Sequence, residues 1–406
     1  MNRKWFLYNS DYTNDIFTAI LYLKYIKQRC NEIFFVYLQI KYILLCKVIS
    51  GQMKRRGKLP KIEVVDLFCG IGGLSYGMKS AGFKILSGYD LDWTCRYAYE
   101  NNNDAKFNYK DIRNVTGAEI QSQYSKKSIK VLAGCAPCQP FSSYAFKNKK
   151  KDPNKYDLLY EFGRLVKEVH PDIVTMENVP SIASFKLKSV LGDFVTTLKD
   201  EGYSVSYQVV YCPNYGIPQT RKRLVLLASR LGNIDLISQT HKKGNYVTVR
   251  DVIGDLPPLN AGDSCLSDSL HRCVALGELN MRRMKATPYG GGWKDWPEEL
   301  RLECHKKRSG LSFGSVYGRM RWDEPSPTMT TQCTGIGNGR FGHPEQDRAI
   351  SVREAALLQT FPLNYKFFEN EKEVSITKAS RYIGNAVPPR LGKVIADSII
   401  EHIRTH

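Results

Sequence analysis

The sequence lacks any uncharged apolar stretch that could cross a membrane. The longest such piece, residues 33–40, ends at Lys41 and is far shorter than the roughly 20 residues that a transmembrane helix needs. No small-residue cleavage site follows a clean apolar core, so we expect no secretory signal. These absences favour a cytoplasmic protein with no membrane partner.

Paired cysteine spacing and negative charge are also scarce. The eleven cysteines are an odd number scattered through 406 residues, which fits a reducing compartment better than a disulfide framework. Lys and Arg number 59 against 40 Asp and Glu, a net charge of +19. A chain this basic usually meets a polyanion, so nucleic acid is the leading partner and a merely basic protein is the alternative.

Residues 1–56 differ from the rest of the chain. They are rich in Tyr, Phe, Ile and Lys and hold no glycine before Gly51. We treat them as an extension, with the hypothesis that translation begins at Met53 and that residues 54–56 form a basic arm. A peptide from residues 1–52 in mass spectrometry of the natural protein would contradict that start.

The loop at residues 134–142 is the stretch around which the rest of the sequence is interpreted. It follows the apolar run 129–133, which predicts a short buried strand. Pro137 and Pro140 fix the backbone on either side of Cys138, which suits a presented nucleophile. Two alternatives stay open here: a buried cysteine in a loop, or a redox or half-zinc pair made of Cys135 and Cys138.

A second constellation surrounds a glycine-rich turn. The run 62–68 predicts a strand that leads into Gly70, Gly72 and Gly73, without the spacing of a dinucleotide fingerprint or a P-loop. Asp90 ends the next predicted strand, roughly 20 positions later, where a carboxylate can bind ribose hydroxyls. Asp111 ends a third predicted strand, where it could accept from an adenine amine. Each Asp could equally be a helix cap or turn residue.

Together, ordered motifs make the chain resemble the cytosine-C5 DNA methyltransferase family from about residue 61 onward. The motifs are Asp66 to Gly73, the loop 134–142, Glu177-Asn178-Val179, Gln219 to Arg223, and Gly384 to Pro389. The resemblance implies an α/β fold: a Rossmann-like sheet of the S-adenosylmethionine-dependent methyltransferases with a smaller, irregular target-recognition domain. The catalytic and cofactor domain would be residues 57–230 plus 375–406, and the recognition domain residues 231–374.

The resemblance also implies catalytic roles. Cys138 would be the thiolate that attacks C6 of cytosine, and Glu177 would meet the ring N3 and the exocyclic amine. Arg223, together with Arg221, would bind the cytosine O2 and hold the loop. From the residues alone, Glu177 could instead be an ion-paired structural residue, and the two arginines could be exposed beside the predicted strand 224–227.

By the same resemblance, S-adenosyl-L-methionine is the expected cofactor. Asp90 stands where the family commonly has Glu, and Leu91 follows where a side chain covers the adenine. The residues expected at the cofactor are Phe68, Gly70, Gly72, Gly73, Leu74, Asp90, Leu91, Asp111, Ile112, Pro137 and Asn385.

Double-stranded DNA is the expected substrate, and its target base must be flipped out of the stack. The expected DNA contacts are Gln139, Ser142, Lys147, Lys149, Arg319, Arg321 and Arg340. Lysines after the nucleophile could meet phosphates or simply be solvated. Cys265, His271, Cys273, Cys304 and His305 fit no common zinc spacing, so no metal is expected.

We expect the enzyme to be monomeric, to act at the nucleoid through DNA, and to be the modification half of a restriction–modification system whose endonuclease cuts the same site. Rival functions are a transfer-RNA cytosine-C5 methyltransferase and a non-catalytic DNA-binding regulator. In the C-terminal part, Ser351 is predicted to cap a helix over 352–359, and a final helix over 391–403 is predicted to pack on the first domain.

Overall fold

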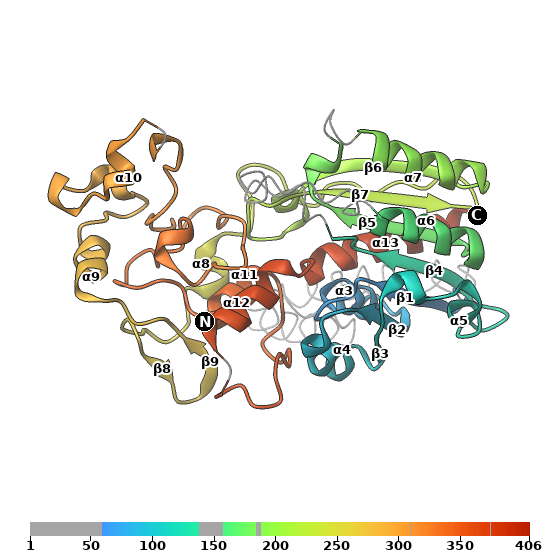
Figure 1. The fold of residues 1–406 in the computed structure, drawn as a ribbon, viewed down its shortest axis with the longest axis horizontal. Coiled ribbons are helices and arrows are strands. Elements are labelled where there is room, and N and C mark those ends of the chain that lie inside the picture. The colour runs from blue at the N-terminus through green and yellow to red at the C-terminus, as the bar shows by residue number, and fades with distance from the viewer. Residues whose placement is uncertain (1–58, 138–156, 184–187, 309, 374) are drawn as a thin grey trace, which may run out of the picture. The chain divides into compact units, whose positions relative to one another are not determined.

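The computed structural model describes residues 59–137, 157–183, 188–308, 310–373 and 375–406. Residues 60–406 form one compact unit, and its main feature is a seven-stranded sheet (Figure 1). The strands are β1 (Ile62–Leu67), β2 (Lys84–Asp90), β3 (Lys106–Tyr109), β4 (Ile129–Gly134), β5 (Ile173–Asn178), β6 (Ser204–Tyr211) and β7 (Lys222–Ser229).

The order of the strands is β3-β2-β1-β4-β5-β7-β6. Strands β1 to β5 all run parallel to one another, whereas β7 runs antiparallel to both β5 and β6. The order reverses between β1 and β4, and ligands of open α/β sheets bind beyond the carboxyl ends of the strands at such a point. The predicted Rossmann-like sheet is therefore confirmed, with β1 and β4 at its centre.

Helices cover both faces of the sheet. They are α3 (Gly73–Ser80), α4 (Arg96–Asn103), α5 (Gly117–Gln121), α6 (Asp157–Val169), α7 (Lys188–Asp200) and α13 (Pro389–Thr405). Successive strand residues point to opposite faces, so Val64 belongs to one core with α3, α4 and α13, and Val65 to another with α5, α6 and α7.

The final helix α13 packs against α3, as Figure 1 shows for the red and blue ends of the colour range. The approach is close enough to require glycine. A Cβ on Gly73 would overlap the carbonyl oxygen of Val387, and one on Gly77 would overlap that of Pro389. The prediction that the C-terminal helix returns to the first domain is confirmed.

The segment between β7 and α13 is far less regular. Its elements are α8 (Val249–Ile253), β8 (Ser264–Cys265), β9 (Asp268–Arg272), α9 (Glu278–Lys285), α10 (Glu303–Lys306), α11 (Val352–Leu358) and α12 (Ile376–Asn385). Helix α11 begins with the predicted Ser351 cap, which forms a capping box with Glu354. Two small aromatic and apolar clusters, one around Met284 and one around Trp293 and Trp296, lie within this segment.

None of the helices in the described ranges combines the length and apolar character needed to span a bilayer.

Candidate active site

The candidate site begins where β4, β5 and β7 meet. Glu177 lies within β5, opposite Val225 of β7, and Arg223 lies two residues further along β7 on the same face. Cys135 directly follows β4. Strand β5 continues one residue beyond Glu177, so Glu177 is held by strand pairing with β7.

The Glu177 carboxylate is 3% exposed and has a neighbour at each oxygen. Cys135 Sγ donates to Oε2 at 2.9 Å, and Arg223 Nε lies 2.9 Å from Oε1 as an ion pair. A buried carboxylate needs such partners, because leaving water without them costs several kcal/mol. The alternative of an ion-paired Glu177 is therefore correct as geometry, and it is compatible with a role in chemistry.

The loop after β4 is anchored before it leaves the described residues. Cys135 N donates to Leu67 O at 3.2 Å across to β1, and Asn178 Nδ2 donates to Ala136 O at 3.4 Å. Pro137 is exposed and is the last residue of this loop that the structure describes. The predicted nucleophile Cys138 comes next in the chain and lies outside the described residues, as do Gln139, Ser142, Lys147 and Lys149.

Arg221 has a different environment from Arg223. Its Nη1 donates to Met329 O at 3.1 Å and its Nη2 to Ala386 O at 3.4 Å. Burial and the adjacent charge of Arg223 lower the pKa of Arg221 to about 9. Arg221 is not an exposed residue beside the strand: it joins the start of β7 to the recognition segment and to the end of α12.

The glycine-rich turn after β1 is shaped by a carboxylate on β2. Asp90 Oδ2 accepts from Gly70 N at 2.8 Å, and Oδ1 accepts from Asp92 N at 2.8 Å. Burial raises the pKa of Asp90, while these two backbone donors lower it. Gly70 has a φ of +49° and open space where a Cβ would stand. Of the three glycines, Gly70 faces a space that a ligand could enter.

Gly72 and Gly73 have another reason to be glycine. A Cβ on Gly72, whose φ is +87°, would overlap the amide of Asn103, and a Cβ on Gly73 would meet the C-terminal segment. Both positions are therefore fixed by packing of protein on protein. The sequence could not distinguish this from backbone approach to a ligand, because both require the absence of a side chain.

The remaining predicted cofactor residues lie at the ends of β1, β2 and β3 or beside them. Leu91 is 55% exposed after β2, whereas Leu74 and Ile112 are buried in the two cores. Strand β3 ends at Tyr109, two residues before Asp111. Asp111 caps a short turn by accepting from Arg113 N at 2.9 Å and pairs with the Arg113 guanidinium. Phe68 (φ +59°) and exposed Asn385 complete the set.

One buried carboxyl group beneath the turn was missed as a functional candidate. Asp66 in β1 accepts from Ser75 Oγ at 2.6 Å through Oδ2, while its Oδ1 has no hydrogen-bond partner among the described residues. Burial raises the pKa of Asp66 to about 7, with a further contribution from Asp90. The available signal was a carboxylate near the end of an apolar strand that also carries Glu63 near its start.

The predicted DNA-contacting arginines do not share one environment. Arg319 is 4% exposed, and its guanidinium donates to four carbonyl oxygens at 2.7 to 3.1 Å. Its acceptors are Met284, Thr287, His343 and Gln346, with Asp347 as its ion-pair partner. In this structure the donors of Arg319 hold the backbone of the recognition segment, and its contact with DNA stays a prediction.

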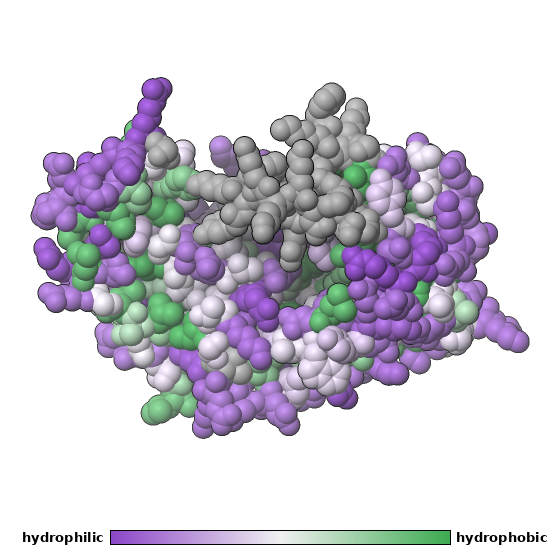
Figure 2. All heavy atoms as spheres, viewed as in Figure 1, coloured by the Kyte–Doolittle hydropathy of each residue, from purple (hydrophilic) through white to green (hydrophobic). Residues whose placement is uncertain are grey.

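Arg340 and Arg321 lie nearer the surface. Arg340 Nη1 donates to Gly290 O and Gly291 O, both at 2.6 Å, and burial lowers the pKa of Arg340. The Arg321 side chain is 47% exposed and lies over the ring of Tyr289. On the face shown in Figure 2, hydrophilic residues predominate over scattered hydrophobic ones.

The histidines and cysteines that raised a zinc question are engaged elsewhere. His271 Nε2 donates to Pro257 O at 2.7 Å and Nδ1 accepts from Ser351 Oγ at 2.9 Å. His305 stacks on Trp293 with ring centroids 4.1 Å apart. In the part of the chain that the structure describes, no group of three His, Cys, Asp or Glu residues is arranged to hold a metal ion.

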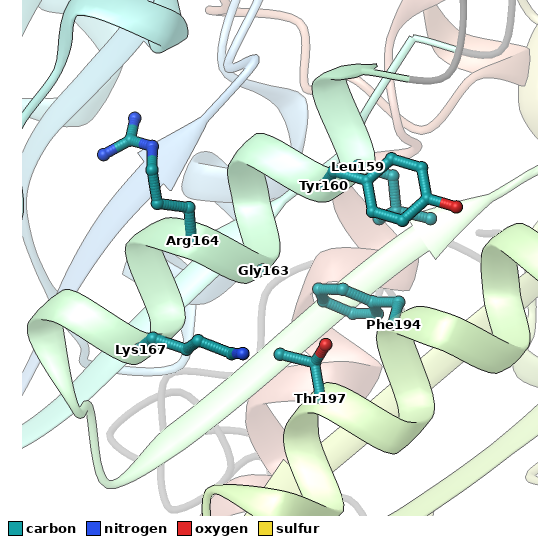
Figure 3. A pocket seen from close by; sticks show the side chains of 7 residues that line it. All are labelled: Leu159, Tyr160, Gly163, Arg164, Lys167, Phe194 and Thr197. Atoms are coloured by element: carbon teal, nitrogen blue, oxygen red, sulfur yellow. The ribbon is translucent and has the colours of Figure 1, made fainter.

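A surface hollow of about 240 Å³ lies elsewhere, between α6 and α7. Figure 3 shows Tyr160 and Lys167 of α6 on the side of Phe194 and Thr197 of α7, while Arg164 extends away from them. None of the predicted site residues lines it. The hollow is therefore a groove between neighbouring helices on the outer side of the sheet, separate from the cluster around Glu177.

These observations agree with a comparison against protein families. The chain belongs to the C-5 cytosine-specific DNA methylase family, whose model matches residues 62–401. It is accordingly a DNA (cytosine-5)-methyltransferase. The match includes the sheet, the cluster around Glu177 and the irregular segment together.

Individual relatives point the same way. Type II methylase M.HgiDII of Herpetosiphon aurantiacus is 54% identical over 336 residues, which cover 83% of this chain and 94% of the relative. Type II methyltransferase M1.HphI of Haemophilus parahaemolyticus is 28% identical over 398 residues, or 97% of each chain.

Among solved structures, a candidate DNA modification methyltransferase encoded within an E. coli prophage has a TM-score of 0.64 at 20% identity. The match covers 84% of this chain and 99% of that one. Spodoptera frugiperda DNMT2 has a TM-score of 0.57 at 16% identity, over 85% and 100% of the two chains. At these identities the likeness shows the shared fold.

Proposed function

We propose that this enzyme methylates C5 of a cytosine within one short duplex DNA sequence, as the modification half of a restriction–modification system. The observation that carries the proposal is the buried Glu177 carboxylate, held between Arg223 and Cys135 beside the strand end from which residue 138 follows. The relatives named as Type II methylases support the restriction–modification role. A cognate endonuclease would recognise the same sequence, and we propose that the methyltransferase acts as a monomer on the chromosome in the cytoplasm.

The chemistry follows from the weakness of cytosine C5 as a nucleophile. The Cys138 thiolate adds to C6, and the electrons of the C5–C6 double bond then make C5 able to attack a methyl group. Glu177, at N3 and the exocyclic amine, offsets the charge that develops on the ring as sulfur adds, and Arg223 binds O2. After C5 has gained the methyl group, a base or water takes the C5 proton, the C5–C6 double bond re-forms, and the Cys138 thiolate leaves.

The residues after β1 and β2 fit S-adenosyl-L-methionine, which supplies the methyl group from a positively charged sulfur. Asp90 has two backbone donors, and a carboxylate accepts about four hydrogen bonds, so it retains capacity for two ribose hydroxyls. The open space at Gly70 lies in the same turn. Exposed Leu91 can cover one side of an adenine, and Asp111 can accept from its amine.

Because the Glu177 carboxylate is buried at strand ends, a base stacked in a duplex cannot reach it. We propose that the target cytosine is flipped out of the helix. Gln139, Ser142, Lys147 and Lys149 would close over the DNA, and Arg321 with Arg340 would contact it from the recognition domain, residues 231–374. Residues 57–230 and 375–406 would form the catalytic domain, with Arg221 joining the two.

The test is bisulfite sequencing of DNA from cells that express the wild-type enzyme or Cys138→Ser. We expect cytosine methylation at one short sequence in the first and none in the second. A tritium-transfer assay on duplex DNA and on transfer RNA runs beside it. Methylation that survives in Cys138→Ser, or transfer to RNA alone, would contradict the proposal.

A further inference from the structure

Cys135 occupies a position in the candidate site that the proposed chemistry leaves without a role. Its backbone is fixed by the bond from its N–H to Leu67 O, and the next residue is fixed by the bond from Asn178. The thiol therefore projects from a point anchored on β1 and β5. From there, Sγ reaches Glu177 Oε2 at 2.9 Å.

The orientation of the Glu177 carboxylate depends on this contact. The last torsion of a Glu side chain is broad and roughly two-fold, so one partner on Oε1 leaves the carboxylate plane free to rotate. Arg223 supplies that one partner as an ion pair, and Oε1 has no hydrogen bond among the described residues. The Cys135 thiol gives Oε2 a directional hydrogen bond, and it fixes the plane because the two anchors then lie at the end of β4 and on β7.

A thiol is suited to this task in a way that stronger donors are not. The S–H group is a weak donor, so it holds the carboxylate while withdrawing little of its charge. A carboxylate accepts about four hydrogen bonds, and two of those sites remain for a cytosine. A thiol that donates a hydrogen bond to a carboxylate keeps its proton. Cys135 is therefore not a second nucleophile.

We propose that Cys135 is a positioning residue for Glu177: its thiol fixes the carboxylate plane in which Glu177 meets the target cytosine. This inference rests on the proposed role of Glu177. It predicts that Cys135 affects the chemical step through Glu177 and has little effect on DNA binding.

The test uses the full-length enzyme with Cys135→Ala, Cys135→Ser, Glu177→Gln and the Cys135→Ala, Glu177→Gln double variant. We expect Cys135→Ala to lower kcat by about tenfold, since bonds to charged groups are the stronger ones and a thiol is a weak donor. KM for duplex DNA should change by less than about twofold, because the substitution removes no interaction that the bound DNA makes equally before and during the reaction. Cys135→Ser should recover only part of kcat, because its hydroxyl again holds the carboxylate but withdraws more of its charge than the thiol does.

The double variant asks whether Cys135 acts through Glu177. In the Glu177→Gln background, Cys135→Ala should cost nothing further, because residues acting as a unit are not additive. Cys212→Ala is the matched control: Cys212 is fully buried nearby, and its N–H donates to Arg221 O. Its thermal unfolding shows how much a lost buried thiol costs in stability alone.

The outcomes separate a failure of the role of Cys135 from a failure of the role of Glu177. If Glu177→Gln loses activity while Cys135→Ala keeps the wild-type kcat, the role of Cys135 is refuted and the proposed function stands. An equal loss on both backgrounds, or an equal loss of kcat in Cys212→Ala, also refutes it. A Glu177→Gln enzyme of wild-type activity would instead refute the proposed role of Glu177 itself.

Discussion

The sheet and the recognition segment differ in what forms hydrogen bonds with their buried backbone groups. In the sheet, backbone groups pair in continuous ladders, and helices such as α3 and α13 approach closely through glycine. The described part of residues 231–350 has only one two-stranded ladder, β8 with β9. There, arginine side chains reach backbone carbonyls, as Arg319 does for four of them. In the recognition segment, therefore, buried arginine charge takes over part of the work that strand ladders do in the sheet.

Two buried carboxyl groups make this contrast concrete. Glu354 in α11 is 1% exposed and accepts from both ends of the Arg348 guanidinium at 2.7 and 2.8 Å. Burial opposes ionisation of Glu354, yet Arg348 holds its pKa below the usual value. Asp66 in β1 is as deeply buried but has no cation, so burial raises its pKa. Equal burial therefore accompanies pKa shifts in opposite directions in the two regions.

The largest expected effect comes from removing the cation in the recognition segment. Arg348→Met leaves Glu354 buried without its partner, which we expect to lower the free energy of unfolding by about 3–5 kcal/mol. Urea unfolding followed by circular dichroism measures it. The control is Arg321→Met, since Arg321 is half exposed and should stay within about 0.5 kcal/mol of wild type. Similar losses in both variants would break the comparison.

A smaller effect should follow from disturbing the close helix contact of the sheet region. Gly77→Ala places a methyl group against the backbone of α13 and should cost about 1–3 kcal/mol. Gly192→Ala is the matched control within α7, because a Cβ there meets open space. It should raise stability by about 1 kcal/mol through helix propensity. Changes of the same sign in thermal unfolding would show that the contact with α13 does not matter.

The smallest effect concerns the unpaired carboxyl group. Since the pKa of Asp66 is about 7 in the folded state and near 4 when unfolded, the folded protein binds more protons between these values. Its stability therefore falls as pH rises. Between pH 6 and pH 8 the loss is about 1.4 kcal/mol, and Asp66→Asn should abolish it. Urea unfolding at both pH values measures this, with exposed Asp104→Asn as control. Parallel curves for wild type and Asp66→Asn would contradict the argument.

The sequence predicted the sheet region well because its signals are local. Apolar runs gave β1 and β4 nearly to the residue, the end of β2 at Asp90 and the middle of the longer β7, and the Ser351 cap gave α11. Each element forms from neighbours in the chain, so composition and spacing carry the information. Strand β3 was placed too late by about two residues, since a four-residue strand offers little periodicity.

The candidate site was predicted as residue types rather than as contacts. Glu177 and Arg223 were named, but the bond from Cys135 joins residues on separate strands, and no local pattern reveals it. The contacts of Arg319 with four backbone carbonyls were equally hidden in the sequence. A lone arginine in an irregular segment looks the same in sequence whether it faces DNA or four carbonyls, because its acceptors come from distant turns.

The contact of α3 with α13 also sets the order in which the enzyme can become active during synthesis. Helix α3 leaves the ribosome early, with its glycine face uncovered, while α13 emerges only after the whole recognition segment has been made. The turn that carries Gly70 and Gly73 gains its support from the C-terminal segment at that moment. A nascent chain therefore holds every residue of the Glu177 cluster before the turn after β1 has the backbone that packs against Gly73 and Gly77.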